Sequence, residues 1–139
     1  MTKQLILNIE EIYVKVDCKI GSRYCGKCCY NTEMILFKED IERITKLGYP
    51  RDFFTMRQGN INVLRNINGH CVFLDPETNR CKIYRHRPIG CRLYPLVYDI
   101  DRDIVIIDAE CPKTKELSEK HIKIYEPLIR YLLKREGLI

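Results

Sequence analysis

The chain has 139 residues, of which 45% are hydrophobic and 31% are charged, and its formal net charge is +5. This balance is typical of a globular protein, and the length predicts a single domain over residues 1–139. The charge is too small to predict a nucleic-acid partner. No stretch approaches the roughly 18–20 apolar residues that a membrane helix needs. Because the N-terminus also becomes polar too soon for a signal peptide, we predict a cytoplasmic protein without a membrane partner.

The first third of the chain combines two helical patterns with a cysteine-rich loop. Apolar residues recur every three to four positions over residues 4–16, which predicts an amphipathic helix. Residues 17–31 contain four cysteines and two glycines and are expected to form a loop. A short strand is predicted over residues 33–37, followed by a helix over residues 38–47 that ends at Gly48.

The middle of the chain predicts short strands joined by turns. Residues 50–54 are expected to form a turn that buries both of their Phe side chains. Residues 61–67 and 71–74 flank Asn68-Gly69, a pair typical of tight β-hairpin turns, so these two segments are predicted to pair. A second turn is predicted over residues 75–79.

The last third of the chain predicts another hairpin and a C-terminal helix. Residues 96–100 and 104–108 are short apolar strands on either side of an Asp-Arg-Asp turn. Residues 114–136 have a helical pattern, in which Pro127 predicts either a kink or a division into two short helices. The predicted architecture is a small α+β domain, with helices at both ends, short antiparallel strands between them, and cysteine loops suited to binding metal.

Eight cysteines are the most informative feature of the sequence. They are Cys18, Cys25, Cys28, Cys29, Cys71, Cys81, Cys91 and Cys111. An even number suits a disulfide framework in a secreted protein, but in a reducing cytoplasm clustered thiols more often bind metal. Disulfides stay open as the minor alternative, because hyperthermophile proteins can retain them inside the cell. Since thiolates bind both zinc and iron–sulfur clusters, we predict a metal partner, zinc or iron, the latter including a 4Fe–4S cluster.

The spacing of the cysteines leaves the number of metal sites open. Cys25 and Cys28 form a C-x-x-C unit, in which a tight turn points two sulfurs at one ion. Thioredoxin-like redox motifs share this spacing, but they follow a strand, whereas the residues before Cys25 are polar and irregular. Cys29 follows directly, so it serves a second metal, turns inward in a bent loop, or is a small buried hydrophobe. His70 precedes Cys71 and is either a ligand or, as we favour, a turn residue.

With these residues laid out, the sequence resembles the YkgJ-type cysteine-cluster family, or CxxCxxCC family, whose domains are described as chelating zinc or iron. The resemblance rests on residues 24–29, 71–74 and 81–95. The last of these matches the pattern C-x-I-Y-x-x-R-P-x-x-C-R-x-Y-P at every fixed position. The family-like core runs over residues 18–112 and closes with Cys111-Pro112, which leaves residues 113–139 as a C-terminal helical segment. The resemblance implies that the eight cysteines are the metal ligands.

One departure from the family pattern concerns its opening motif. The pattern C-x-x-C-x-x-C-C is present as Cys18, six residues, Cys25, two residues and Cys28-Cys29, so its first gap is four residues longer. The departure bears on Cys18 more than on the other seven cysteines. Some relatives are described as flagellin lysine N-methylases, in which this domain is part of a longer chain. Because no separate glycine-rich loop for a methyl donor is visible, a metal- or cluster-dependent enzyme of that kind is the alternative to a metal-binding protein.

The stretch from Arg80 to Arg92 contains five basic residues and no acidic one. Arg87 and Arg92 either hydrogen-bond loop carbonyls and balance the charge of the thiolates, or bind an anionic small molecule through forked contacts. Tyr84 and Tyr94 lie close to them in sequence and are expected to pack in the core with hydrogen-bonded hydroxyls. We assign these four residues to the surroundings of the metal or to an anion site. No catalytic residue is assigned, and a protein partner stays open.

Overall fold

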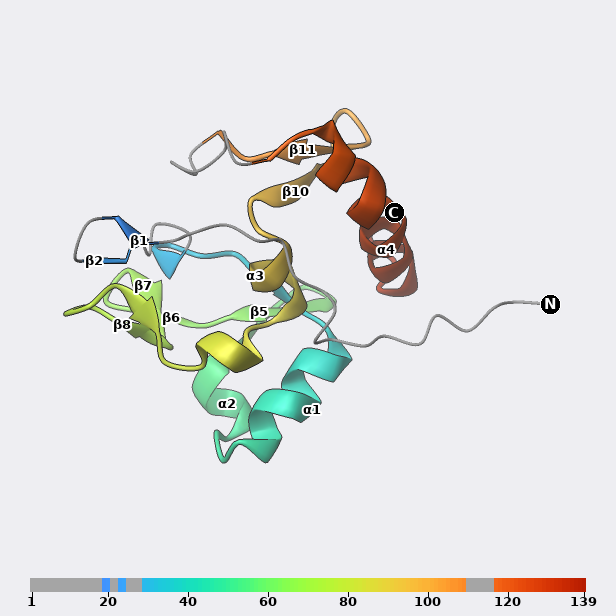
Figure 1. The fold of residues 1–139 in the computed structure, drawn as a ribbon. Helices are drawn as coiled ribbons and strands as arrows, with labels where there is room; N and C mark the ends of the chain where they lie inside the picture. Colours follow the sequence, from blue (N-terminus) through green and yellow to red (C-terminus); the bar gives the residue numbers. More distant parts are fainter. Residues whose placement is uncertain (1–18, 21–22, 25–28, 110–116) are drawn as a thin grey trace.

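The computed structural model describes residues 19–20, 23–24, 29–109 and 117–139. Within these residues, four α-helices and a set of short antiparallel strand pairs form a small α+β fold (Figure 1), which confirms the predicted class. The helix predicted over residues 4–16 lies outside the described residues. No helix in the described part of the chain is long and apolar enough to cross a membrane.

A two-stranded hairpin occupies the segment between the first two cysteines. Strand β1 (Lys19–Ile20) pairs antiparallel with β2 (Arg23–Tyr24), with Lys19 opposite Tyr24 and Ile20 opposite Arg23. The sequence predicted only a loop here. The six residues that separate Cys18 from Cys25 therefore contain a hairpin, which accounts for the greater length of this gap.

A three-stranded sheet forms the middle of the molecule. It has the order β3-β5-β4, from β3 (Ile35–Leu36), β5 (Ile61–Leu64) and β4 (Thr55–Gln58). Strand β4 was not predicted from the sequence, because its side chains are largely exposed and give no apolar alternation. The chain turns from β4 into β5 at Gly59, whose φ of 59° is a conformation that glycine adopts without strain.

The predicted pairing of residues 61–67 with 71–74 is correct only next to the turn. There, β6 (Asn66–Ile67) pairs with β7 (His70–Cys71) across Asn68-Gly69, and both turn residues have positive φ, as a tight hairpin turn requires. Strand β5 instead pairs with β3 and β4. The reason is that two partners satisfy the hydrogen-bonding groups on both edges of β5, which one long hairpin would not do.

Two helices pack on one side of the sheet, α1 (Lys38–Lys46) and the four-residue α2 (Arg51–Phe54). Helix α1 and its stop at Gly48, whose φ is 107°, confirm the prediction. The expectation that residues 50–54 bury both Phe side chains is wrong, because Phe54 is fully buried whereas Phe53 is 44% exposed. Successive helical residues point about 100° apart, so a single turn cannot direct both rings into the core.

A short hairpin and two short helices follow β7. Strands β8 (Leu74–Asp75) and β9 (Arg80–Cys81) pair across the predicted second turn. The 3₁₀-helix η3 (Tyr84–His86) then leads into α3 (Ile89–Leu93). The segment that carries the family-specific pattern is thus a hairpin edge followed by two helical turns.

The C-terminal part consists of the hairpin of β10 (Leu96–Asp99) with β11 (Ile104–Ile107) and the long helix α4 (Glu119–Arg135). The hairpin confirms the prediction. Helix α4 begins at Glu119, because residues 117 and 118 are not helical, and residues 114–116 of the predicted helix lie outside the described residues. Helix α4 continues through Pro127, so the division into two short helices is wrong. Burial of Leu132 and Leu133 beyond the proline holds the second half of α4 against the core.

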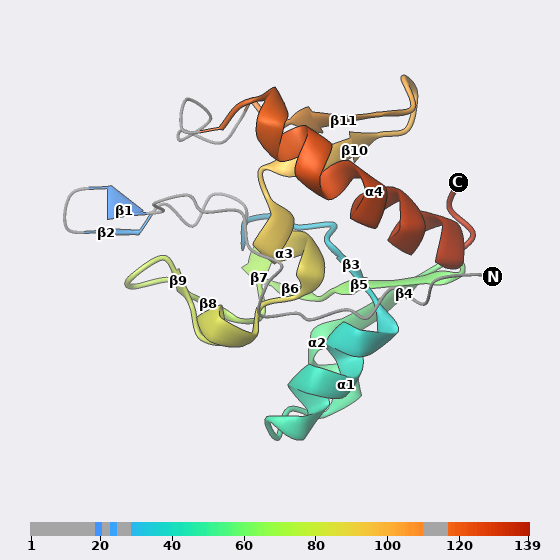
Figure 2. The same cartoon turned by 45° about the vertical axis from the view of Figure 1, so that its right-hand side comes forward.

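Two apolar clusters lie on the two faces of this arrangement. The first cluster, the helix-side core, is covered by α4 and the β10–β11 hairpin. The second, the cysteine-side core, is covered by α1, α2 and the β6–β9 segment. In both views α3 and the β3–β5–β4 sheet lie between α4 with the β10–β11 hairpin on one side and α1 with α2 on the other (Figure 2). The helix-side core contains Phe37, Ile89, Leu93, Leu96, Val105, Leu117, Ile129, Leu132 and Leu133. The cysteine-side core contains Leu36, Ile44, Phe54, Leu64, Cys71, Val72, Phe73, Leu74 and Ile83. Leu36 and Phe37 are adjacent, and extended backbone directs them to opposite clusters.

Candidate metal centre

The four described cysteines come from four separate segments and meet at one apolar cluster. Cys71 belongs to the cysteine-side core, and Cys29, Cys81 and Cys91 pack against that core. Cys71 is buried and the other three are half-buried. The structure therefore places against one core predicted ligands that are separated by up to 62 positions in the sequence.

Backbone pairing accounts for the positions of three of these cysteines. Tyr30 forms an isolated antiparallel bridge with His70, which holds the residue after Cys29 against the residue before Cys71. Cys81 lies opposite Leu74 in the β8–β9 pair. Leu74 is three residues after Cys71 in the chain. These backbone contacts fix where Cys29, Cys71 and Cys81 meet the cysteine-side core.

Cys91 reaches the same cluster because α3 lies very close to β3. A Cβ atom at Gly90 would lie 2.2 Å from the Sδ atom of Met34, which also packs against the cysteine-side core. Only glycine fits this approach without displacing the Met34 side chain. Gly90 is therefore the residue that allows α3 to bring the neighbouring Cys91 against the core.

The remaining predicted ligands, Cys18, Cys25, Cys28 and Cys111, lie outside the described residues. Within the ranges that the structure does describe, no group of three or more His, Cys, Asp or Glu side chains is arranged to hold a metal ion. What these ranges show is a partial donor set, four thiols gathered on one core. Its chemistry fits zinc or iron, both of which bind thiolate.

His70 is the first residue of β7, directly after the Asn68-Gly69 turn and not part of it, so the favoured assignment as a turn residue is wrong by one position. Its Nδ1 lies 2.8 Å from the carbonyl oxygen of Cys71, and its ring packs edge-on against Tyr30 at 6.2 Å. Because a carbonyl only accepts hydrogen bonds, Nδ1 is the donor in this contact. His121, on α4, accepts a hydrogen bond from the backbone N–H of Ser118 at 3.2 Å through Nδ1, and so caps the start of that helix.

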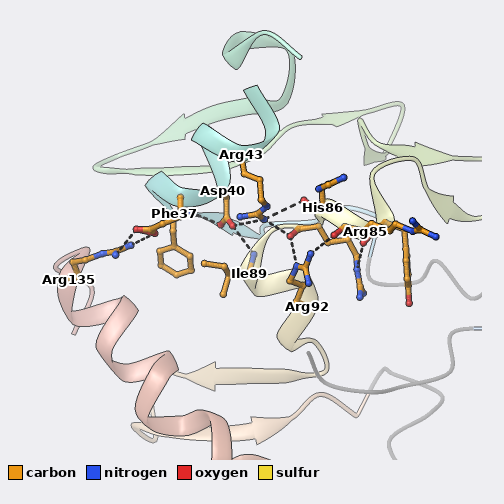
Figure 3. Close-up of polar contacts among 11 residues, drawn as sticks. Phe37, Asp40, Arg43, Arg85, His86, Ile89, Arg92 and Arg135 are labelled. Carbon is orange, nitrogen blue, oxygen red and sulfur yellow. Dashed lines mark hydrogen bonds and ion pairs between the residues drawn. The ribbon is translucent and has the colours of Figure 1, made fainter. Parts of the chain in front are cut away.

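Arg87 and Arg92, the two arginines at fixed positions of the family pattern, hydrogen-bond the carbonyls of residues 84–87. Arg92 is 8% exposed, and its guanidinium donates to the carbonyl of Arg87 at 3.1 Å and to the carbonyl of Arg85 (Figure 3). Arg87 donates from Nε to the carbonyl of Tyr84 at 3.0 Å and lies 4.0 Å above the Tyr84 ring. Arg87 and Arg92 thus hydrogen-bond loop carbonyls, which is the first of the two alternatives that the sequence left open. These bonds fix the chain between Cys81 and Cys91.

A buried carboxylate that sequence reasoning missed supports the same loop. Asp40 of α1 is fully buried and accepts hydrogen bonds from the backbone N–H groups of Phe37 and Ile89, each at 2.9 Å (Figure 3). The guanidinium of Arg43 forms an ion pair with the Asp40 carboxylate at 3.2 Å, and it donates a hydrogen bond to the carbonyl of Arg87 at 2.6 Å. Burial raises the pKa of Asp40, although these hydrogen bonds oppose the shift.

Tyr94 directly follows α3, at its C-terminal end. Its hydroxyl donates a hydrogen bond to the Asp108 carboxylate at 2.7 Å, which agrees with the expectation of a hydrogen-bonded hydroxyl. Both residues line a cavity of about 620 Å³ whose wall is otherwise mostly apolar and is formed by β3, β10 and α4.

A known protein family matches the stretch of the chain that contains the eight cysteines. A family model named CxxCxxCC, with the description "Putative zinc- or iron-chelating domain", matches residues 17–121. An uncharacterized protein of Methanocaldococcus jannaschii is 31% identical to the chain over 136 residues, which cover 82% of this chain and 70% of that protein. No solved structure matches the chain significantly.

Proposed function

Because this chain belongs to the CxxCxxCC family of zinc- or iron-chelating domains, also called the YkgJ-type family, we propose that its eight cysteines bind the metal. The observation that supports this most directly is the gathering of Cys29, Cys71, Cys81 and Cys91 on one core from four separate segments. Apolar packing does not require cysteine at four such positions, whereas a thiolate metal centre does.

The metal contributes to folding in this proposal. The strands around the cysteines are only two to four residues long, and strand pairs of this length do not hold together in isolation. A metal ion or cluster that joins four loops supplies the missing constraint, so its binding energy becomes part of the folding free energy.

The β1–β2 hairpin supports a role for Cys18 in spite of its longer spacing. Lys19 and Tyr24 lie opposite each other, and in the sequence Cys18 directly precedes Lys19 and Cys25 directly follows Tyr24. In both views the hairpin lies on the same side of the molecule as β7 and β8. We therefore include Cys18 among the ligands, with the extra four residues forming the hairpin rather than removing Cys18 from the centre.

Arg87 and Arg92 act around the metal rather than on a substrate in this proposal. Both bond the carbonyls of residues 84–87, and so they hold the chain between Cys81 and Cys91 in one conformation. Their positive charge also offsets the negative charge of a thiolate centre. Four thiolates around zinc carry a net charge of about −2.

The test is metal analysis of the full chain purified without oxygen, with an absorption spectrum of the same sample. The proposal expects bound zinc in a colourless protein, or bound iron, in which case acid-labile sulfide and a broad band near ~400 nm identify an iron–sulfur cluster. Protein that contains no metal and whose thiols are all oxidised would contradict the proposal in favour of disulfides.

A further inference from the structure

The outer side of the β9–η3 segment contains a basic pocket. A cavity of about 410 Å³ is lined by residues 75, 78 and 80–86. The residues that line it include four basic ones, Arg80, Lys82, Arg85 and His86, and one acidic residue, Asp75. We propose that this pocket binds a small anion of the phosphate or carboxylate class.

The charges of the pocket favour an anion. In the part of the chain that the structure describes, neither Lys82 nor Arg85 forms an ion pair with a carboxylate. The one acidic neighbour, Asp75, uses its Oδ1 to accept the backbone N–H of Glu77 at 3.0 Å within the β8–β9 turn. The ammonium of Lys82 and the guanidinium of Arg85 are donors that match the oxygens of a phosphate or carboxylate.

The backbone behind the pocket is fixed before any ligand binds. The carbonyl oxygens of residues 84–87, which would repel an anion, accept hydrogen bonds from Arg87, Arg92 and Arg43 on the inner side of the loop (Figure 3). The loop therefore divides its cations: the inner arginines hold the carbonyls, while Lys82, Arg85 and His86 are exposed on the pocket side. A prepared loop lowers the entropic cost of binding.

The pocket also contains Cys81, so a bound anion would lie beside a proposed metal ligand. The alternative role of these cations is to balance the charge of the metal thiolates. The two roles differ in what they predict, because charge balance requires no affinity for a free anion. The anion site does not depend on the proposed metal function and can be tested separately from it.

The experiment is calorimetric titration of the full chain, as purified without oxygen, with inorganic phosphate and, separately, with citrate, at constant ionic strength set by chloride. We expect one binding event, and the anion with the higher affinity identifies the ligand class. Lys82→Ala and Arg85→Ala should each weaken binding roughly tenfold, and Arg85→Lys should retain part of the affinity. Lys120→Ala is the matched control, because it removes an equally exposed cation from α4, and it should bind as the wild type does.

Lys82 and Arg85 are exposed, so their removal leaves the fold intact, and metal content is measured in the same samples. Absence of binding of both anions to the wild type would overturn the proposal, as would equal affinity in the wild type, Lys82→Ala and Arg85→Ala. Loss of metal from these two variants, with no anion binding to the wild type, would assign the cations to charge balance instead.

Discussion

The carboxylate of Asp40 in α1 accepts a hydrogen bond at 2.9 Å from the backbone N–H of Ile89, the first residue of α3, 49 residues along the chain. Its second oxygen accepts the N–H of Phe37 at the start of α1 itself. One fully buried side chain thus joins the beginnings of two helices. Because α3 contains Cys91 and Arg92, Asp40 holds the helix that positions a proposed metal ligand.

Replacement of Asp40 by Asn should destabilise the protein by about 2–4 kcal/mol. The amide keeps one acceptor but places an NH₂ group against one of the two backbone N–H donors, and it leaves Arg43 without its ionic partner. Denaturation by urea measures the change. Glu42→Gln is the matched control, because Glu42 lies on the exposed face of the same helix and should change the free energy of unfolding little. A loss no larger than that of the control would contradict the assigned role of Asp40.

The same residue predicts a pH dependence. Burial raises the pKa of Asp40 above its ordinary value of 3.8, so the folded protein binds this proton more tightly than the unfolded chain does. Between the ordinary and the raised pKa, the contribution of Asp40 to the free energy of unfolding therefore falls as pH rises. The difference in stability between the wild type and Asp40→Asn should narrow with rising pH across this window, measured by urea denaturation at a series of acidic pH values. A difference that widens would contradict the raised pKa.

Replacement of Cys91 by Ser should remove metal and destabilise the fold, because a serine hydroxyl is a poor ligand for zinc or iron. Metal analysis and thermal denaturation of the same sample measure both effects. Ile83→Val is the control, since it removes one methylene from the cysteine-side core and should cost about 0.5–1.5 kcal/mol without loss of metal. Full metal content in Cys91→Ser would remove Cys91 from the ligand set.

The ion pair between Glu39 and Arg135 should couple α1 to α4. Two contacts of 2.6 and 2.8 Å join their side chains, which are 19% and 23% exposed. A double-mutant cycle with Glu39→Gln and Arg135→Gln should give a coupling free energy of about 1 kcal/mol, reduced at high salt. The pair of Asp99 and Arg102, whose arginine is 63% exposed, is the control and should couple less. Equal coupling in the two pairs would show that burial adds nothing to the contact between α1 and α4.

Local pattern was enough to predict several elements. The Asn68-Gly69 turn, the β10–β11 hairpin, α1 and its stop at Gly48 depend on neighbours within a few residues, so their chemistry is legible in the sequence. Strand β4 and the exposure of Phe53 were not predicted. Both depend on which partner a short segment meets, and no local periodicity encodes that choice.

The sequence by itself determined the chemistry of this protein: eight thiols, their spacing, and the family-specific segment over residues 81–95 already indicate zinc or iron. Only the tertiary structure decided which groups meet. It places Cys29, Cys71, Cys81 and Cys91 on one core, turns Arg92 inward and Arg85 outward, and joins Asp40 to Ile89. The physical reason is that these contacts form between elements far apart in the chain, where packing and the satisfaction of buried backbone groups, rather than local propensity, select the partner.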